Sequence, residues 1–538
     1  MTERPHANPW PYAVSGLLAA AAGMAVGHLV AAWTDPATSP VLAVGSRVID
    51  ASPPALKDWA VSTLGTADKP VLLGSVAIVT GALAAAIGVL ARRRRQLALF
   101  ALTALAAVAG LAALASGGGG PLAVVPSLAA WITGLVVLPW LADRADEVTG
   151  RSPRAPAPSP AEGDGDTARS PAQTWEQAST EPHPAPARRT FVLGAGAVGL
   201  GSVVVGGAGQ VLAGPIVAPR AATLPPVPAP LPALPTGIEA TVAGVSALWT
   251  PLDDFYRVDT AFTIPRVDVS TWRLFVDGMV DNELSVGFEE LVGLGLVERD
   301  VTLNCVSNEV GGPYIGSTRW TGVPVRLLLE RAGVQSSADQ VLSTSVDGMT
   351  ISTPVEALLA TGDREALVAV AMDGQPLPAR NGYPARLITP GLYGYVGATK
   401  WVTRLTLTTF AADKAYWSTR GWAEQATVQI QTRIDTPRRG GVDAGQVAIG
   451  GVAWAQAGGG IERVEVRIDD GAWQEARLGP DVGPVYWRQW WLPWQATKGK
   501  HRLTARATDS EGTVQTSAEA PVAPSGATGW HSVEVTVV

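Results

Sequence analysis

Residues 301–312, VTLNCVSNEVGG, contain the single cysteine of this 538-residue chain, Cys305. The apolar, β-branched start of this stretch predicts a strand that runs directly into a loop with Ser307, Asn308 and two glycines. A lone cysteine excludes an internal disulfide and cannot by itself hold zinc or an iron–sulfur cluster. A thiolate is nevertheless a soft ligand for a transition metal, provided that an incoming cofactor supplies the other ligands. The alternative is an inert thiol packed in the core.

A second block downstream, residues 372–407, carries Arg386 and Lys400 among tight Pro and Gly turns. Grouped in this way, the two cations could hold a phosphate through charge-assisted hydrogen bonds. The alternative is that each side chain is solvated or paired with a carboxylate. The surrounding segment, residues 245–426, mixes short strands with short helical stretches and predicts one α+β domain.

From about residue 427 the pattern changes to alternating strands separated by Gly and Asp turns, as in IERVEVRIDDGAWQEARL and HRLTARATDSEGTVQ. This spacing predicts an antiparallel β-sandwich of immunoglobulin type over residues 427–538. Without a cysteine pair, its core would depend on large side chains such as Trp454, Trp473 and Trp490.

In these three blocks and in their order, roughly residues 245–538 resemble the sulfite oxidase family of molybdenum enzymes, including its bacterial members exported by the twin-arginine route. TLNCVSNEVGG resembles the family loop whose cysteine binds molybdenum, and RNGYPARLITPGLYGYVGATKWV resembles the segment that wraps the molybdopterin. The resemblance implies a molybdopterin-binding domain followed by an immunoglobulin-like dimerisation domain, and hence a homodimer.

The same resemblance implies roles for individual residues. Cys305 is expected to be the thiolate ligand of molybdenum, and Arg257 is expected to contact the substrate oxyanion and the cofactor. Further expected cofactor contacts are Asp253, Tyr256, Asn381, Arg386, Gly397, Thr399 and Lys400. Asn381 stands where sulfite oxidases have histidine and the methionine sulfoxide reductase branch has asparagine, and Gly397 stands where relatives often have serine.

Two departures bear on the substrate. Sulfite oxidases have an arginine at the position of Val310 and an active-site tyrosine at the position of Trp422. Arg319 or Arg380 could replace the lost charge. We therefore predict two-electron oxygen-atom transfer at a sulfur compound, with an anionic or S-oxide substrate. The alternatives are a reductase of methionine sulfoxide or other S- or N-oxides, and a cofactor-free surface binding module.

The N-terminal part is strongly apolar, with uncharged runs at about 11–33, 70–91, 96–115 and 121–141. Each run is long enough to cross a bilayer, so residues 1–141 are predicted to form four transmembrane helices. Arg92–Arg95 separates the second run from the third and lies inside if the N-terminus is cytoplasmic. A soluble hairpin of buried helices is the alternative. Because these runs contain one histidine, His28, whereas bis-histidine ligation needs two, we expect no haem in this chain.

Residues 142–187 are rich in Pro, Ala, Ser and acidic residues and predict a disordered cytoplasmic linker. Arg188 and Arg189 then precede an uncharged stretch, as in a twin-arginine export signal, so residues 188–218 are predicted to be a fifth crossing. Within this stretch FVLGAGAVGLG has the glycine spacing of a dinucleotide fingerprint, but the next acidic residue is Glu239. That lies too far away for the motif, which needs an acid about 20 positions on.

Residues 219–244 are predicted to be a proline-rich spacer, so the later domains would be extracytoplasmic in a multi-pass membrane protein. The net charge of −7 argues against a nucleic-acid partner. Since no haem domain is fused to the soluble part, electrons are expected to pass to or from a separate cytochrome or quinone-linked partner. Apolar residues form 47% and charged residues 16% of the sequence, a balance that favours a membrane part.

Overall fold

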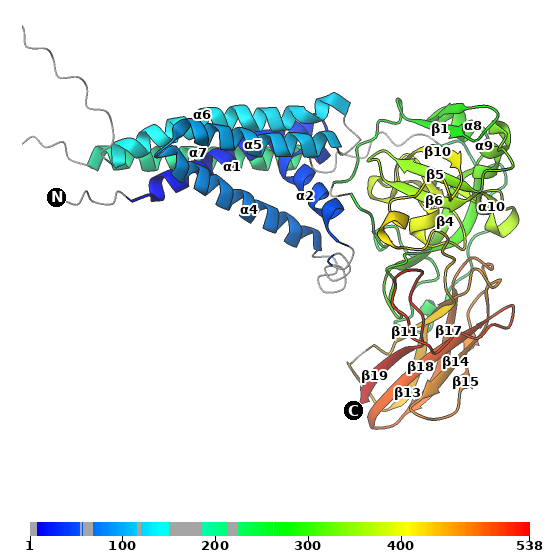
Figure 1. Ribbon diagram of the computed structural model, residues 1–538. Helices are drawn as coiled ribbons and strands as arrows, with labels where there is room; N and C mark the ends of the chain where they lie inside the picture. Colours follow the sequence, from blue (N-terminus) through cyan, green and yellow to red (C-terminus); the bar gives the residue numbers. More distant parts are fainter. Residues whose placement is uncertain are drawn as a thin grey trace, which may run out of the picture. The chain divides into compact units, whose positions relative to one another are not determined.

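The computed structural model describes residues 8–53, 56, 68–115, 120–149, 185–213, 224–261, 263–438 and 440–538. The chain divides into two compact units, Met1–Ile216 and Val217–Val538 (Figure 1). The first unit is helical, and the second contains β-sheets with short helices.

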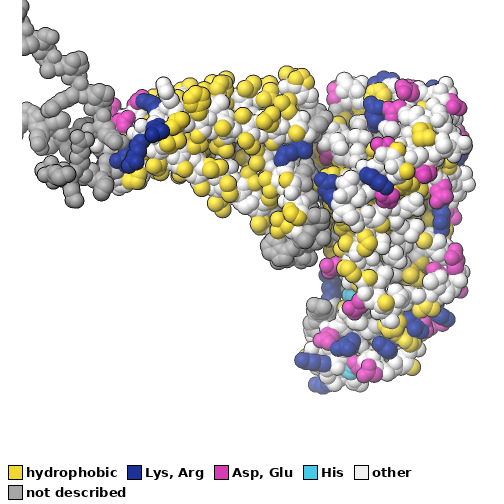
Figure 2. Space-filling view, in the orientation of Figure 1, with side chains coloured by type: hydrophobic (Ala, Val, Ile, Leu, Met, Phe, Trp, Pro, Cys, Tyr) yellow, Lys and Arg dark blue, Asp and Glu magenta, His cyan; other side chains and the backbone are white. Residues whose placement is uncertain are grey.

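Six α-helices are described in the helical unit: α1 (Trp10–Trp33), α2 (Pro40–Ala51), α4 (Asp68–Ala91), α5 (Arg95–Ala115), α6 (Val125–Val148) and α7 (Ala185–Ala213). Five of them are long and apolar enough to cross a membrane, and only α2 is too short. Large apolar side chains stay exposed along them, and Figure 2 shows apolar side chains covering much of this unit on the face drawn. Such a surface is compatible with lipid contact.

Helix α1 is the centre of the helical unit and packs mainly against α4, α6 and α7. Its contact with α4 is made by backbone: a Cβ built on Gly16 would lie 2.0 Å from the Ala84 carbonyl oxygen, and one built on Gly88 would lie 2.0 Å from the Tyr12 carbonyl oxygen. Small residues allow apolar helices to approach closely where no hydrophobic effect drives them together.

The glycine stretch of the apparent dinucleotide fingerprint lies inside α7, which is helical throughout. A Cβ on Gly194 would lie 3.2 Å from the Trp140 ring, and one on Gly199 would lie 3.6 Å from Leu18. These glycines therefore face neighbouring helices, and the strand and turn that a nucleotide motif requires are not formed. The helices also extend past the predicted limits of the linker, because α6 ends at Val148 and α7 begins at Ala185. Residues 150–184, most of the predicted linker, lie outside the described residues.

Two sheets form the first part of the second unit. One has the order β2-β1-β10-β5-β6 and the other β3-β4-β7-β8, with β9 paired to β7. The strands of the first sheet are β1 (Arg273–Gly278), β2 (Leu284–Gly287), β5 (Gln340–Ser345), β6 (Thr350–Pro354) and β10 (Val402–Thr408). Those of the second are β3 (Val297–Asn304), β4 (Ile315–Pro324), β7 (Leu367–Met372), β8 (Gln375–Pro376) and β9 (Arg386–Ile388).

Strand β7 has the sequence LVAVAM and is buried at every position, as expected of a strand covered on both faces. Short helices fill the space around the sheets. They are α8 (Phe288–Gly293), α9 (Val325–Ala332), α10 (Val355–Leu358) and α11 (Gly394–Gly397). Helix α9 buries Leu328 and Leu329 and ends at Ala332, and the following Gly333, with a φ of 71°, caps the helix in the left-handed conformation.

The C-terminal part is rich in sheet, as the alternating sequence predicts. One sheet has the order β11-β13-β17-β16 and the other β12-β19-β18-β14-β15, and residues of both share one apolar core. Their longer strands are β11 (Gln431–Thr436), β13 (Gly445–Trp454), β14 (Ile461–Ile468), β17 (Arg488–Ala496), β18 (Gly499–Asp509) and β19 (His531–Val537). The short strands are β12 (Gly440–Val442), β15 (Gln474–Glu475) and β16 (Arg477–Leu478). We call this two-sheet structure the sandwich; its immunoglobulin-type topology and the predicted domain limits stay predictions.

Part of the proline-rich spacer lies against the second unit instead of standing away from it. The Leu231 amide donates to Glu298 Oε2 at 2.7 Å, and Arg319 donates to the carbonyl oxygens of Leu231 and Pro232 at 3.2 and 2.7 Å. Leu224 and Val227 pack against the core of the first sheet. We call residues 224–235 the strap.

Candidate functional site

Cys305 is the first residue after β3, at the start of a loop that returns into β4. Its amide donates to the Tyr314 carbonyl oxygen at 3.0 Å, and its own carbonyl oxygen accepts from the Asn308 amide at 3.0 Å. The Tyr314 amide donates to Asn308 Oδ1 at 2.8 Å. These three hydrogen bonds close the loop and hold the buried thiol in one place at the end of a rigid strand.

The sandwich holds the cysteine loop from its other side. Arg433, in β11, donates to the Gly312 carbonyl oxygen at 2.9 Å. Gly311 has a φ of 80°, and a Cβ built there would lie 2.2 Å from His531 Nε2, so only glycine fits at this contact. The other ring nitrogen of His531 accepts from the Ile434 amide at 2.9 Å. The sandwich therefore takes part in positioning Cys305, which the sequence pattern did not reveal.

Arg386 is a buried cation at the start of β9. It donates to the carbonyl oxygens of Asn381 and Ala398 at 2.9 and 3.4 Å, and no carboxylate in the described part of the chain forms an ion pair with it. Burial lowers the pKa of its guanidinium to about 10. Holding an arginine in this way is unfavourable unless an anion comes to it.

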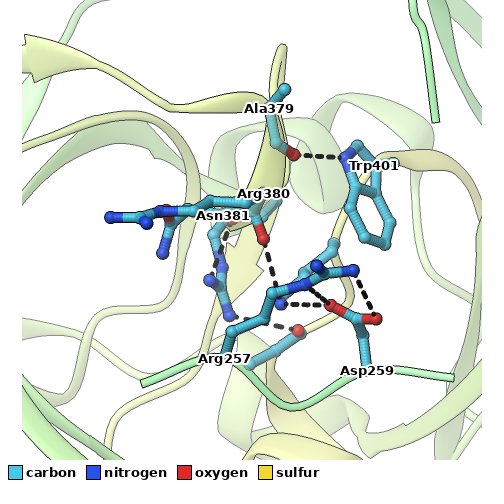
Figure 3. Close-up of polar contacts among 9 residues, drawn as sticks. Arg257, Asp259, Ala379, Arg380, Asn381 and Trp401 are labelled. Carbon is cyan, nitrogen blue, oxygen red and sulfur yellow. Dashed lines mark hydrogen bonds and ion pairs between the residues drawn. The ribbon is translucent and has the colours of Figure 1, made fainter. Parts of the chain in front are cut away.

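Lys400 is a second cation in the same place. Its Nζ donates to Asp259 Oδ2 at 2.9 Å and to the Arg380 carbonyl oxygen at 3.2 Å. Asp259 also accepts from Arg257, at 2.8 Å from Nε and 3.2 Å from the terminal nitrogen, and Figure 3 shows its carboxylate facing that guanidinium. Burial lowers the pKa of Lys400 to about 8, although Asp259 opposes the shift. The sequence analysis missed Asp259, whose only signal is its place two residues after Arg257.

Cys305 and the cations are close enough to influence one another. Burial raises the pKa of the Cys305 thiol, while hydrogen bonds from Ser307 and the charge of Lys400 oppose the shift. Tyr256 has a pKa well above its usual value, first because it is buried and then because of Cys305, while Arg386 lowers it. The thiol is therefore protonated at neutral pH when no metal is bound, and a metal would have to stabilise the thiolate.

Several buried polar atoms around this cluster have no hydrogen-bond partner among the described residues. They are Asn304 Oδ1, Asn308 Nδ2, Asn381 Oδ1, Tyr383 OH, Arg386 Nε and Thr389 Oγ1. Each unsatisfied buried group costs about 1–3 kcal/mol, so folded proteins rarely keep many together. These atoms all belong to residues 301–312 and 372–407, the two blocks that carry Cys305, Arg386 and Lys400. Together with the buried cations, they indicate a ligand that is anionic and rich in hydrogen-bonding atoms.

The structure thus brings Cys305, Tyr256, Arg257, Arg386 and Lys400 into one electrostatically coupled cluster. Three other predicted residues border it: Asn381 is 1% exposed and contacts Arg386 through its carbonyl, Thr399 Oγ1 lies 2.6 Å from Ser343 Oγ, and Gly397 lies against Thr389. Asp253 is different, because its side chain is 97% exposed and pairs with Arg380 at 3.0 Å.

Arg319 and Arg380 are the candidates to replace the charge missing at Val310. Either side chain would have to break existing contacts to reach a substrate. Arg319 forms two hydrogen bonds with Asp300, at 2.9 and 2.8 Å, and also holds the strap. Arg380 is engaged with Asp253 and with the Leu252 carbonyl oxygen. Arg257, with 36% of its side chain exposed, is the most accessible cation of the cluster, and it is already paired with Asp259.

Binding of a sulfate ion to the cofactor-free protein should weaken as the pH rises through about 8, the pKa of Lys400. The protonated amine attracts the anion, and above its pKa the affinity should fall about tenfold per pH unit. Isothermal titration calorimetry between pH 6.5 and 9.5 would measure this effect. Lys400→Met should bind more weakly and show no such step; an unchanged pH profile in that variant would contradict the assignment.

Comparisons with known proteins agree with this chemistry. Residues 261–417 match the family described as the oxidoreductase molybdopterin binding domain, a range that includes Cys305, Arg386 and Lys400. The chain is 29% identical to mitochondrial sulfite oxidase of Homo sapiens over 326 residues, which cover 51% of this chain and 59% of that protein. It is 28% identical to nitrate reductase [NADH] of Solanum lycopersicum over 178 residues, 28% of this chain and 19% of that protein.

Among solved structures, the sulfane dehydrogenase SoxCD of Paracoccus pantotrophus matches with a TM-score of 0.41 and 25% identity, over 47% of this chain and 70% of that chain. The chain spans less than two thirds of the length of the sulfite oxidases that it resembles. The match to the molybdopterin-binding domain lies within the second unit.

Proposed function

Because the chain belongs to the sulfite oxidase family of molybdenum-cofactor oxidoreductases, we propose that its second unit catalyses two-electron oxygen-atom transfer at a sulfur compound. The observation that carries the proposal is the buried cluster of Cys305, Arg386 and Lys400, surrounded by polar atoms that have no partner among the described residues. No group of three His, Cys, Asp or Glu side chains in the described ranges could hold a metal alone. Cys305 needs a cofactor that brings the other ligands.

The residues present fit a molybdopterin cofactor. Cys305 would supply the thiolate to the metal, Arg386 and Lys400 would hold the phosphate, and Asn381 and Tyr383 have buried polar atoms to offer to the pterin. When bound, the cofactor supplies two-electron redox chemistry coupled to transfer of an oxygen atom. The chain orients the cofactor, excludes water from the thiolate and keeps the hydroxyl of Tyr256 protonated beside it.

In the oxidising direction the substrate takes an oxygen atom from water, and two protons and two electrons are released. The electrons would leave to a separate cytochrome or quinone-linked partner. In the reducing direction an S-oxide would lose its oxygen as water, with two protons and two electrons taken up. Atoms and electrons balance in both directions, and the same residues would bind the cofactor in each.

A reductase of S-oxides is the second candidate, and one observation favours it. Arg257 is paired with Asp259, Arg319 with Asp300 and Arg380 with Asp253, so each of these three arginines already has an acidic partner. With Val310 in place of an arginine, the pocket is less suited to a dianion and better suited to a neutral S-oxide.

We further propose that the five long apolar helices anchor the protein in a membrane as a multi-pass protein with the second unit extracytoplasmic. Arg92–Arg95 and the pair Arg188 and Arg189 would then lie on the cytoplasmic side. Export of a unit that folds around its cofactor in the cytoplasm would need the twin-arginine route. The sandwich would mediate a homodimer.

The deciding experiment uses the full chain, purified in detergent from a host that makes molybdopterin. Near-stoichiometric molybdenum by mass spectrometry is expected, together with either sulfite oxidation coupled to ferricyanide or methionine sulfoxide reduction by a reduced donor. The active assay identifies the direction. A folded protein without molybdenum would refute the proposal and favour the cofactor-free binding module.

A further inference from the structure

We propose that Thr389 is an additional contact to the bound cofactor, with its hydroxyl hydrogen-bonded to a polar atom of the pterin part. This inference rests on the proposed function. Thr389 directly follows β9, the strand that begins with Arg386, and its side chain is 2% exposed. Its Oγ1 has no partner in the part of the chain that the structure describes. A hydroxyl that is removed from water in this way needs another partner.

The surroundings of Thr389 point to the cofactor site. A Cβ built on Gly397 would lie 3.0 Å from Thr389 Cβ and 3.4 Å from its Oγ1, so Thr389 lies directly against the turn in which the resemblance places cofactor contacts. The absence of a side chain at Gly397 therefore lets this turn pack closely against Thr389 and Leu392. At the other end of β9, Arg386 donates to the Ala398 carbonyl oxygen at 3.4 Å. Both ends of β9 thus reach the turn that leads to Lys400.

Two neighbouring threonine hydroxyls do form hydrogen bonds within the protein. Thr353 Oγ1 donates to the Val396 carbonyl oxygen at 2.7 Å, and Thr399 Oγ1 lies 2.6 Å from Ser343 Oγ. Both residues are fully buried, as Thr389 is. Thr389 differs from them because its hydroxyl has no partner among the described residues, although it lies beside Gly397, an expected cofactor contact.

The test compares Thr389→Val with the parent chain, each purified with and without cofactor. Valine keeps the shape of threonine and removes the hydroxyl. Without cofactor, the melting temperature of the variant should be equal to or above that of the parent, because no protein hydrogen bond is lost. With cofactor, the half-life of molybdenum retention during dialysis should fall about fivefold or more. Thr389→Ser keeps a hydroxyl and should retain molybdenum nearly as long as the parent.

Two matched controls separate this role from a structural one. Thr353→Val removes a hydroxyl that has a protein partner, so it should lower the melting temperature of the cofactor-free protein. Thr508→Val removes another buried hydroxyl without a partner among the described residues, in the sandwich, and should leave molybdenum retention unchanged.

Equal retention by Thr389→Val and the parent would overturn the proposal, as would equal losses from Thr389→Val and Thr389→Ser. A parent chain that never acquires molybdenum refutes the proposed function instead, so the two failures are distinguishable.

Discussion

Replacing Cys305 by serine is expected to lower the molybdenum-dependent activity of the full chain by at least about 100-fold, since removing residues that merely support metal ligands already costs 10–100-fold. Serine is nearly the same size, and the loop is closed by backbone bonds to Tyr314 and Asn308 that do not involve the thiol. The fold should therefore survive. The alkoxide that would have to replace the thiolate is a harder ligand and is much less accessible at neutral pH.

The measurement is steady-state activity normalised to folded protein, with molybdenum content determined in the same samples. Asn308→Ala is an informative companion, because it removes the side chain that closes the loop and leaves the thiol in place. It should reduce activity less than Cys305→Ser does. Full activity in Cys305→Ser would show that the thiolate is not a ligand, and Cys305 would then be an ordinary buried thiol.

Arg386→Met and Arg319→Met should have opposite effects on stability, and only Arg386→Met should lower the cofactor content. The pKa of the Arg386 guanidinium falls from 12.5 to about 10, which means that burying its charge costs about 3 kcal/mol of folding free energy. Removing that charge should therefore stabilise the cofactor-free protein, while the loaded protein should lose most of its molybdenum because the phosphate loses a buried partner. Differential scanning fluorimetry and metal analysis on the same preparations would measure both effects.

Arg319→Met should instead destabilise the protein. It leaves Asp300, with 12% of its side chain exposed, without its partner, and it releases the carbonyl oxygens of the strap. We expect the free energy of unfolding to fall by about 2–3 kcal/mol, a small value for a buried ion pair because both side chains are partly solvated. The molybdenum content per folded protein should not change. A destabilised Arg386→Met that keeps its molybdenum would contradict the view that Arg386 is held for an anion.

The helices were largely predictable because length and hydropathy are local properties of the sequence. The four predicted runs correspond to α1, α4, α5 and α6, and the fifth predicted crossing corresponds to α7. Helix α2 was missed, since it is short and its apolar residues cover only one face. The close approach of Gly16 and Gly88 was also not predictable, because neither glycine carries a signal of its partner helix.

The candidate site was predictable only as far as its motifs extend. Cys305, Arg386 and Lys400 stand in recognisable blocks, whereas Asp259 depends on a loop that folds back onto Lys400. The contacts of Arg433 and His531 with the cysteine loop come from another part of the chain. The docking of the strap was missed because proline-rich composition predicts stiffness and says nothing about what the segment contacts.

The central position of α1 has a consequence for the order in which the protein is made. Helix α1 leaves the ribosome before the other described helices, yet its neighbours include α7, separated from it by more than 150 positions. Gly206 and Gly209 of α7 pack against Ala25 and His28, so the surface of α1 is complete only once synthesis has passed residue 213. In a membrane-anchored protein, as we propose, that side of α1 would until then be covered by lipid or by the insertion machinery. Assembly of the helical unit is therefore a late step in biogenesis, and a chain interrupted before α7 would present an unfinished bundle to quality control.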